Sequence, residues 1–234
     1  MAKMVGLSRN IKLVWLNKTV EFINEGLSGE ELKSALHEYL SYEIKSKDNL
    51  RKTRDILLRL WSYENEDLTQ LRKDALATIN TDSDNALAAN WALMLVAYPV
   101  FADICKLVGK MSEYQDEITL SQLKQKMFDE WGERTTLYHS MDKIIATLKD
   151  FGVLKSDRPG KYVVTKKKIK NDSVTLLLLK AAMKSSGEHY YSIPSLSNMS
   201  VLFPFEYTPK MEVLLNDKSI TNLSFDGKVS FMIS

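Results

Sequence analysis

Cysteine and histidine are scarce in this 234-residue chain, and the scarcity excludes two kinds of site. Cys105 is the single cysteine, so no intramolecular disulfide can form. With only three scattered histidines beside it, no zinc-ligand spacing can be assembled either. We therefore expect a reducing, cytoplasmic setting and no metal site.

The sequence also lacks the motifs that carry common enzyme chemistry. The P-loop, the dinucleotide-binding GxGxxG, the nucleophile-elbow GxSxG and the zinc-protease HExxH patterns are all absent, and nine glycines supply no phosphate-cradling loop. No pair of carboxylates follows a predicted strand, as a metal-dependent nuclease or a glycosidase would need. These absences predict a protein that is not an enzyme and needs no cofactor.

Long hydrophobic runs are missing too. The N-terminal residues MAKMVGLSRNIKLVW have neither the apolar segment nor the cleavage site of a secretory signal. The one candidate span, residues 86–101, has 16 uncharged residues, which form a helix of about 24 Å against a hydrocarbon core of roughly 30 Å. We therefore predict no membrane contact and interpret residues 85–108 as a buried central helix, kinked or split at Pro99.

The positive charge is regional, although the net charge is only +2. Residues 132–170 carry ten basic and four acidic side chains, whereas residues 61–131 carry six and twelve. A short basic segment in an otherwise balanced chain is typical of a protein that binds an anionic partner at one face.

Residues 1–112 predict a helical N-terminal domain. Ser28 and Glu31 have the spacing of a capping box at the start of one amphipathic helix, and Asp48 is a candidate cap for the next. With the apolar segment described above at its centre, this part of the chain is expected to form a helical bundle.

Residues 113–170 predict a winged helix-turn-helix. Thr119 and Gln122 form a second capping box, and Gly132 ends the helix that follows. Thr135 or Thr136 is the candidate cap of a second helix. That helix carries a single buried stripe of apolar residues: Leu137, Met141, Ile144, Ile145 and Leu148. Two short strands, at residues 153–155 and 161–164, then flank a turn and form the wing.

The side of this second helix opposite the apolar stripe is the candidate recognition face. It presents hydrogen-bonding and cationic side chains: Thr135, Thr136, His139, Lys143 and Thr147. A major groove admits one α-helix, so these side chains can approach base edges while basic side chains contact phosphates. The candidate phosphate contacts are Arg134 at the helix start, Lys155, Arg158 and Lys161 on the hairpin, and Lys166, Lys167 and Lys168 directly after it.

Two other interpretations of this segment stay open. Winged helices also serve as protein-docking modules, in which case Lys166, Lys167 and Lys168 are a solvated linker. An RNA-binding protein would favour single strands through aromatic stacking, and only Tyr138 and Tyr162 lie near the basic residues.

Residues 171–234 predict a small α+β C-terminal appendage. It contains a buried helix over residues 174–182 and a loop anchored by Phe203 and Phe205. Alternating apolar residues about Asp226-Gly227 predict a terminal β-hairpin.

Two segments carry a family resemblance. The run ALMLVAYPVFAD, residues 92–103, and the closing helix motif LKDFGVL, residues 148–154, resemble the small helical BrxA family of bacterial BREX phage-exclusion systems. The resemblance covers about residues 10–165. It implies a cytoplasmic, non-enzymatic, DNA-binding accessory of an anti-phage locus, with winged-helix-like elements in a helical body. The same family has been likened to an RNA-binding antitermination factor, which keeps that alternative open.

The sequence therefore predicts a mainly α protein: a helical bundle with a winged helix-turn-helix and a small α+β C-terminal appendage. The expected function is non-catalytic binding of double-stranded DNA, within an anti-phage assembly that can include other defence proteins. The alternatives are an adaptor that uses the winged helix to dock a protein, or an RNA-binding, antitermination-like factor. The sequence leaves the oligomeric state and the DNA sequence preference open.

Overall fold

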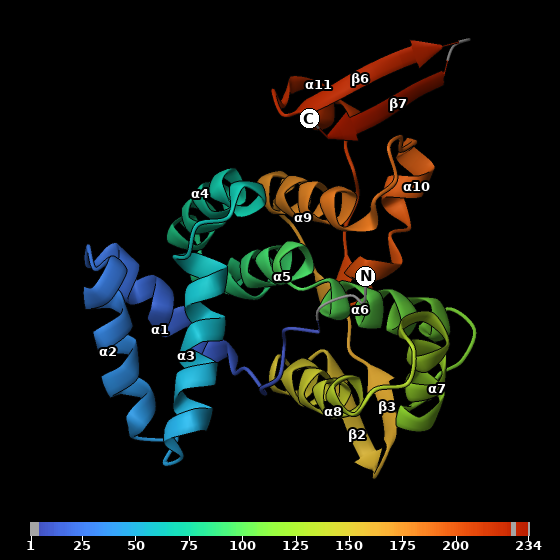
Figure 1. Cartoon of the computed structure of the whole chain (residues 1–234). Coiled ribbons are helices and arrows are strands. Elements are labelled where there is room, and N and C mark those ends of the chain that lie inside the picture. The colour runs from blue at the N-terminus through green and yellow to red at the C-terminus, as the bar shows by residue number, and fades with distance from the viewer. Residues whose placement is uncertain (1–4, 226–227, 234) are drawn as a thin grey trace.

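A computed structural model describes residues 5–225 and 228–233, and these residues are mainly helical with small separate sheets (Figure 1). The α-helices are α1 (Leu13–Asn24), α2 (Gly29–Ser41), α3 (Lys47–Trp61), α4 (Glu66–Thr81), α5 (Ala86–Ala97), α6 (Pro99–Ser112), α7 (Leu120–Trp131), α8 (Thr135–Asp150), α9 (Asp172–Ser186), α10 (Ile193–Ser197) and α11 (Met211–Asn216). Two short 3-10 helices are η1 (Ser83–Asn85) and η2 (Ser200–Leu202).

The strands are short and fall into separate pairs or triplets. They are β1 (Ile118–Thr119), β2 (Leu154–Arg158), β3 (Lys161–Val164), β4 (Lys167–Lys168), β5 (Phe205–Glu206), β6 (Ile220–Phe225) and β7 (Lys228–Ile233). The sheet orders are β1-β3-β2, β4-β5 and β6-β7, and the β4-β5 pair is parallel.

Helices α5 and α6 form the buried centre, as the apolar run predicts. The run is split at Pro99, which occupies the first turn of α6, and the two helices are bent by 115°. The described chain has no single helix that is long and apolar enough to cross a membrane; α5 and α6 pass that test only as a bent pair, by length and composition. Both are mostly buried, and Trp91 on α5 is fully enclosed.

Among the helices α2, α3 and α7, one predicted cap is confirmed and two differ. Thr119 and Gln122 form the predicted capping box at the start of α7. Ser28 is the N-cap residue of α2, but its side chain makes no capping hydrogen bond. The cap of α3 is Ser46, whose Oγ accepts from the backbone N–H of Asn49, so the prediction of Asp48 was wrong by two residues.

Helices α6, α7 and α8 and the strands β1, β2 and β3 make one local unit. Strand β1 pairs antiparallel with β3, and β3 pairs antiparallel with β2, so the predicted hairpin is confirmed and gains a third strand. Trp131 at the end of α7 donates from Nε1 to the Asp103 carboxylate of α6 at 2.8 Å, which ties α7 to the buried centre. In Figure 1 this unit forms the lower right of the molecule.

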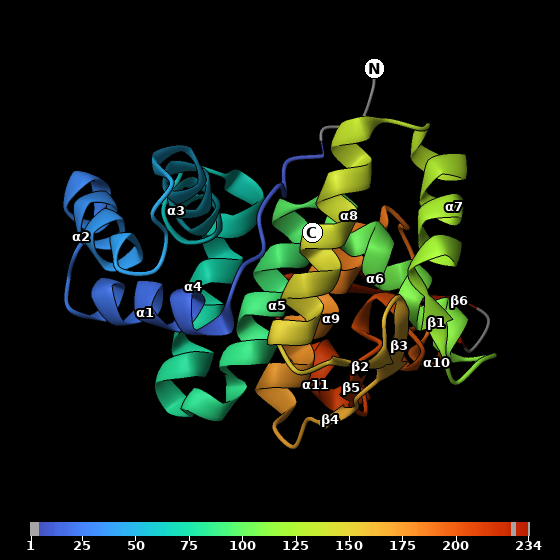
Figure 2. The ribbon, with the colours of Figure 1, turned by 90° about the horizontal axis from the view of Figure 1, so that it is seen from below.

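An extended N-terminal segment, residues 5–12, runs beside α8 (Figure 2). The backbone N–H of Ile11 donates to Thr147 Oγ1 at 2.9 Å, and that of Leu13 donates to the Asp150 carboxylate at 2.9 Å. Thr147 is fully buried as a result. Its predicted place on the exposed face of the helix was therefore wrong, because a segment more than 130 residues earlier in the chain covers it.

The C-terminal region packs on the same core. Trp91 makes edge-to-face contacts with Phe203 and Phe205 at 5.4 Å each, and its Nε1 donates to the carbonyl of Val201. This confirms that the Phe203-Pro204-Phe205 loop is anchored by its aromatic rings. Apolar residues from all three predicted domains belong to one buried cluster. The domain boundaries after residues 112 and 170 stay predictions.

The chain ends in the β6-β7 hairpin, which stands out from the body in Figure 1. Its register is continuous, from Ile220 opposite Ile233 to Phe225 opposite Lys228. The predicted Asp226-Gly227 turn lies outside the described residues. The inner face of the hairpin buries Phe231, whose backbone also pairs with Tyr191.

Candidate nucleic-acid interface

The N-terminal half of α8 presents the predicted polar face to solvent. Thr135, Thr136, His139 and Lys143 are all exposed, while the five residues of the predicted apolar stripe are buried. Neither threonine caps the helix: Arg134 is the N-cap residue, and its side chain makes no capping bond. With Thr147 buried, the exposed polar face ends about one turn after Lys143.

Tyr138 adds an aromatic ring to this surface and is 45% exposed. Its ring stacks on Phe128 of α7, with centroids 6.4 Å apart, and makes an edge contact with His139. The ammonium of Lys124 lies 3.4 Å from the ring centroid and 2.7 Å from the Asp142 carboxylate. These contacts fix the phenol where α7 meets α8. The sequence identifies Tyr138 only as an aromatic residue near the basic side chains.

The wing supplies two exposed cations next to α8. Lys155 on β2 and Arg158 at the tip are exposed, and β2 packs directly against α8. Lys161 differs, because its ammonium lies 2.8 Å from the Glu117 carboxylate and lowers the pKa of that carboxyl. A phosphate that contacts Lys161 has to compete with Glu117.

Arg134 is only half-buried, and its guanidinium lies 5.9 Å from the ring centroid of Trp131. It therefore stands at the start of α8, as the sequence predicts, with its side chain packed against the end of α7. Exposed acidic residues flank the same surface, with Glu133 beside it and Asp157 on the wing.

The three lysines after the wing lie at the other end of α8. Lys166 Nζ donates to the carbonyl of Phe203 at 2.7 Å. Lys167 Nζ lies 3.7 Å from the position that a Cβ on Gly152 would take, just past the C-terminus of α8. A 16-residue helix is about 24 Å long, so these lysines are far from Thr135. Lys168 is exposed on β4, which Figure 2 shows beyond the C-terminal end of α8.

The structure thus brings part of the predicted set together. Thr135, Thr136, His139 and Lys143 share the exposed part of α8, and Lys155 and Arg158 lie on the adjacent wing. This arrangement offers neutral hydrogen-bonding groups flanked by cations. Lys166 donates to a carbonyl of the body, and Lys167 Nζ lies beside Gly152.

The described residues include no candidate metal site and no exposed thiol. Within residues 5–225 and 228–233, no group of three or more histidine, cysteine, aspartate or glutamate side chains is placed to hold a metal ion. Cys105 is fully buried in α6, and burial raises the pKa of its thiol well above the usual value.

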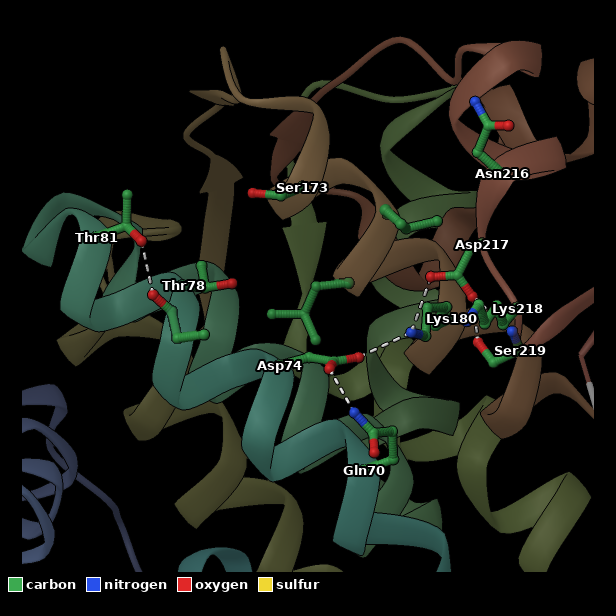
Figure 3. A pocket seen from close by; sticks show the side chains of 13 residues that line it. Gln70, Asp74, Thr78, Thr81, Ser173, Lys180, Asn216, Asp217, Lys218 and Ser219 are labelled. Carbon is green, nitrogen blue, oxygen red and sulfur yellow. Dashed lines mark hydrogen bonds and ion pairs between the residues drawn. The ribbon is translucent and has the colours of Figure 1, made fainter.

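A large groove that the sequence did not predict lies between α4, α9 and the turn between α11 and β6 (Figure 3). Its volume is about 850 Å³. At its floor the ammonium of Lys180 is buried between Asp74 at 2.8 Å and Asp217 at 3.4 Å. Asp217 also accepts from the backbone N–H and the hydroxyl of Ser219. A lysine inside the apolar run VTLLLLKAA was the one sequence signal that could have indicated this cluster.

The Lys180 cluster is better explained as a connection between elements than as a reactive site. Asp74 comes from α4, Lys180 from α9 and Asp217 from the turn between α11 and β6. Asp74 further accepts from Gln70. Each charged group in the cluster therefore has a partner, and together they hold the C-terminal region against the helical body.

Comparisons with known proteins found no match: no protein-family model, no curated protein and no solved structure matches the chain.

Proposed function

We propose that this protein binds double-stranded DNA, with the N-terminal half of α8 in the major groove and the β2-β3 wing along the backbone. The observation that carries the proposal is the exposed face of α8. This face carries two threonines, a histidine and Lys143, whereas the opposite face of the same helix is buried. A helix that presents short hydrogen-bonding side chains can approach base edges closely.

The order of elements supports a winged helix-turn-helix. Helices α6, α7 and α8 are followed by the β2-β3 hairpin, and β1 between α6 and α7 completes a sheet of order β1-β3-β2. In helix-turn-helix proteins the second helix of the motif contacts bases through its N-terminal residues. These are the residues that α8 leaves exposed.

Exposed cations next to this helix supply the attraction to phosphate. Lys143, Lys155 and Arg158 are solvent-exposed on α8 and the wing. Contacts of this kind position a protein on the duplex and carry no sequence information themselves. Thr135, Thr136 and His139 are therefore the residues from which any base preference should come.

The proposal is tested by titrating duplex DNA, single-stranded DNA and RNA of matched length against the wild type and a Lys155→Ala/Arg158→Ala variant. We expect duplex DNA to bind most tightly and the variant to lose affinity about equally for different sequences. Lys73→Ala is the matched control, because Lys73 is an exposed lysine on α4, away from the wing. Equal binding by the wild type and the wing variant would refute the proposal.

A second candidate function is protein docking by the same unit. Val163 on β3 is 41% exposed and Tyr138 is 45% exposed, so the wing and α8 also offer apolar contact area. Lys161 is held by Glu117, which reduces the positive field of the wing. An adaptor would show no duplex binding in the titration above. Preference for single strands would instead favour an RNA-binding role through Tyr138.

A role in phage exclusion is a proposal that rests on the sequence resemblance alone. If it holds, this protein is a DNA-binding accessory of a BREX-like defence assembly. Loss of phage resistance on deletion of its gene, with rescue by the wild type and no rescue by the wing variant, would support that placement.

A further inference from the structure

Among the described residues, strand β6 of the terminal hairpin has β7 as a strand neighbour on one side and no strand on the other; α11, which precedes it, also contacts it. Strand β7 contacts α9, whereas β6 lies on the side of the hairpin remote from α9 (Figure 1). Its residues from Thr221 to Ser224 are all exposed.

The hydrogen bonds of β7 reveal which backbone groups of β6 face outward. Phe231 exchanges both backbone hydrogen bonds with Tyr191, at 2.9 and 2.8 Å, so its N–H and C=O point away from β6. Phe231 is opposite Asn222 in the hairpin register. This pair is therefore a non-hydrogen-bonded one, and the N–H and C=O of Asn222 point out of the edge remote from β7. Those of Ser224, two residues on, point the same way.

Strand β6 lacks three of the features that usually prevent strand pairing. Proteins protect edge strands with charged side chains, proline or a bulge. Residues 220–225 read Ile-Thr-Asn-Leu-Ser-Phe, with no charge and no proline, and the register with β7 shows no bulge. A two-stranded hairpin is also only marginally stable by itself, whereas a sheet of three or more strands is stable.

We propose that β6 pairs antiparallel with β6 of a second copy of this chain across a two-fold axis, which makes a four-stranded sheet of order β7-β6-β6-β7. Antiparallel self-pairing centred on Leu223 sets Leu223 opposite its own copy and Asn222 opposite Ser224, so a charge at these positions would lie opposite or diagonal to the same charge on the second copy. The six residues of β6 carry none, which fits a second copy better than a charged partner.

Leu223 fixes the register of this pairing. It is 45% exposed, on the face of the hairpin opposite to Phe231. If Leu223 lies opposite Leu223 of the second copy, Asn222 and Ser224 of the two chains form hydrogen-bonded pairs on either side. Leucine is then at a non-hydrogen-bonded position, where side chains approach most closely.

Site-directed crosslinking tests the proposal directly. Cys105 is fully buried, so a cysteine introduced on the surface is the only accessible one. Under mild oxidation Leu223→Cys should form a disulfide-linked dimer, because Cα atoms at such a position are about 4.5 Å apart. Ser230→Cys is the matched control. Ser230 lies opposite Leu223 on β7. In the proposed sheet both β6 strands separate the two copies of Ser230, which are therefore too far apart for a disulfide.

Solution mass provides the second test. Light scattering of the wild type should show a monomer–dimer equilibrium in which the fraction of dimer rises with protein concentration. Leu223→Lys should raise the dimer dissociation constant by on the order of tenfold or more, since two ammonium groups then face each other. Ser230→Lys should leave it nearly unchanged. A monomer at every concentration, or equal crosslinking by both cysteine variants, would overturn the proposal.

Discussion

Among single side chains, Lys180 is the one whose replacement should lower the free energy of unfolding most. The residue is 7% exposed, and its ammonium lies between Asp74 and Asp217. Lys180→Met leaves the two carboxylates facing each other without the cation, and we expect the free energy of unfolding to fall by about 3 kcal/mol.

Urea unfolding at pH 7 measures this loss, and Lys218→Met on the exposed rim of the same groove is the control, with almost no expected change. A Lys180→Met variant as stable as the control would show that the cluster does not hold the C-terminal region to the body.

Asp217 should make the stability of the protein depend on pH. Burial raises the pKa of its carboxyl, but the hydrogen bonds from Ser219 and the nearby Lys180 ammonium outweigh burial and hold the pKa below its usual value. A group whose pKa is lower in the folded state stabilises the fold above its unfolded pKa of about 3.9. That stabilisation is lost as the pH falls through the folded value.

We therefore expect the stability difference between the wild type and Asp217→Asn to be largest near neutral pH and to shrink as the pH is lowered from about 5 towards 2. Urea unfolding midpoints measured across this range provide the readout. A difference that stays constant with pH would contradict the assignment of the lowered pKa to Asp217.

At the scale of the helices, the two capping-box signatures give a matched pair of predictions. Thr119 makes both hydrogen bonds of the box at the start of α7, whereas Ser28 makes no side-chain cap at the start of α2. Thr119→Ala should lower the free energy of unfolding by about 1 kcal/mol, and Ser28→Ala by only a few tenths. Chemical denaturation of the two variants distinguishes them, and equal losses would be inconsistent with the observed caps.

Helix periodicity predicted the secondary structure of the central unit well but could not detect its long-range contacts. The buried stripe of α8 and the hairpin after it follow from local spacing, and both are confirmed. Thr147 lies on the polar side of α8 by the same spacing, yet Asn10 and Ile11 cover it. Contacts between residues so distant in sequence leave no local signal, because periodicity records only which face of a helix is apolar.

The run of lysines after the wing illustrates the same limit for the candidate site. Their spacing beside a hairpin favours a phosphate-binding cluster, and this stays a prediction. The parallel β4-β5 pair brings this segment next to Phe203 and Phe205, where Lys166 donates to a carbonyl. Pairing between β4 and β5, which lie almost forty residues apart, could not be deduced from local sequence.

For the whole molecule, the continuous core predicts cooperative unfolding. Trp91 joins α5 to Phe101 of α6 and to Phe203 and Phe205 of the C-terminal loop. Segments that share one core should unfold together, so thermal transitions followed by far-UV and near-UV circular dichroism should coincide. Separate transitions would instead support independent domains divided near residues 112 and 170.

The most direct test of the DNA-binding account is the salt dependence of duplex affinity, measured by fluorescence polarisation. For the wild type, the logarithm of the association constant should fall linearly with the logarithm of the salt concentration. Replacing Lys143, Lys155 or Arg158 with alanine should each reduce that slope by about 1, whereas Lys73→Ala should leave it unchanged. Slopes that none of the three substitutions alters, or no duplex binding at low salt, would contradict the assignment of α8 and the wing as the interface.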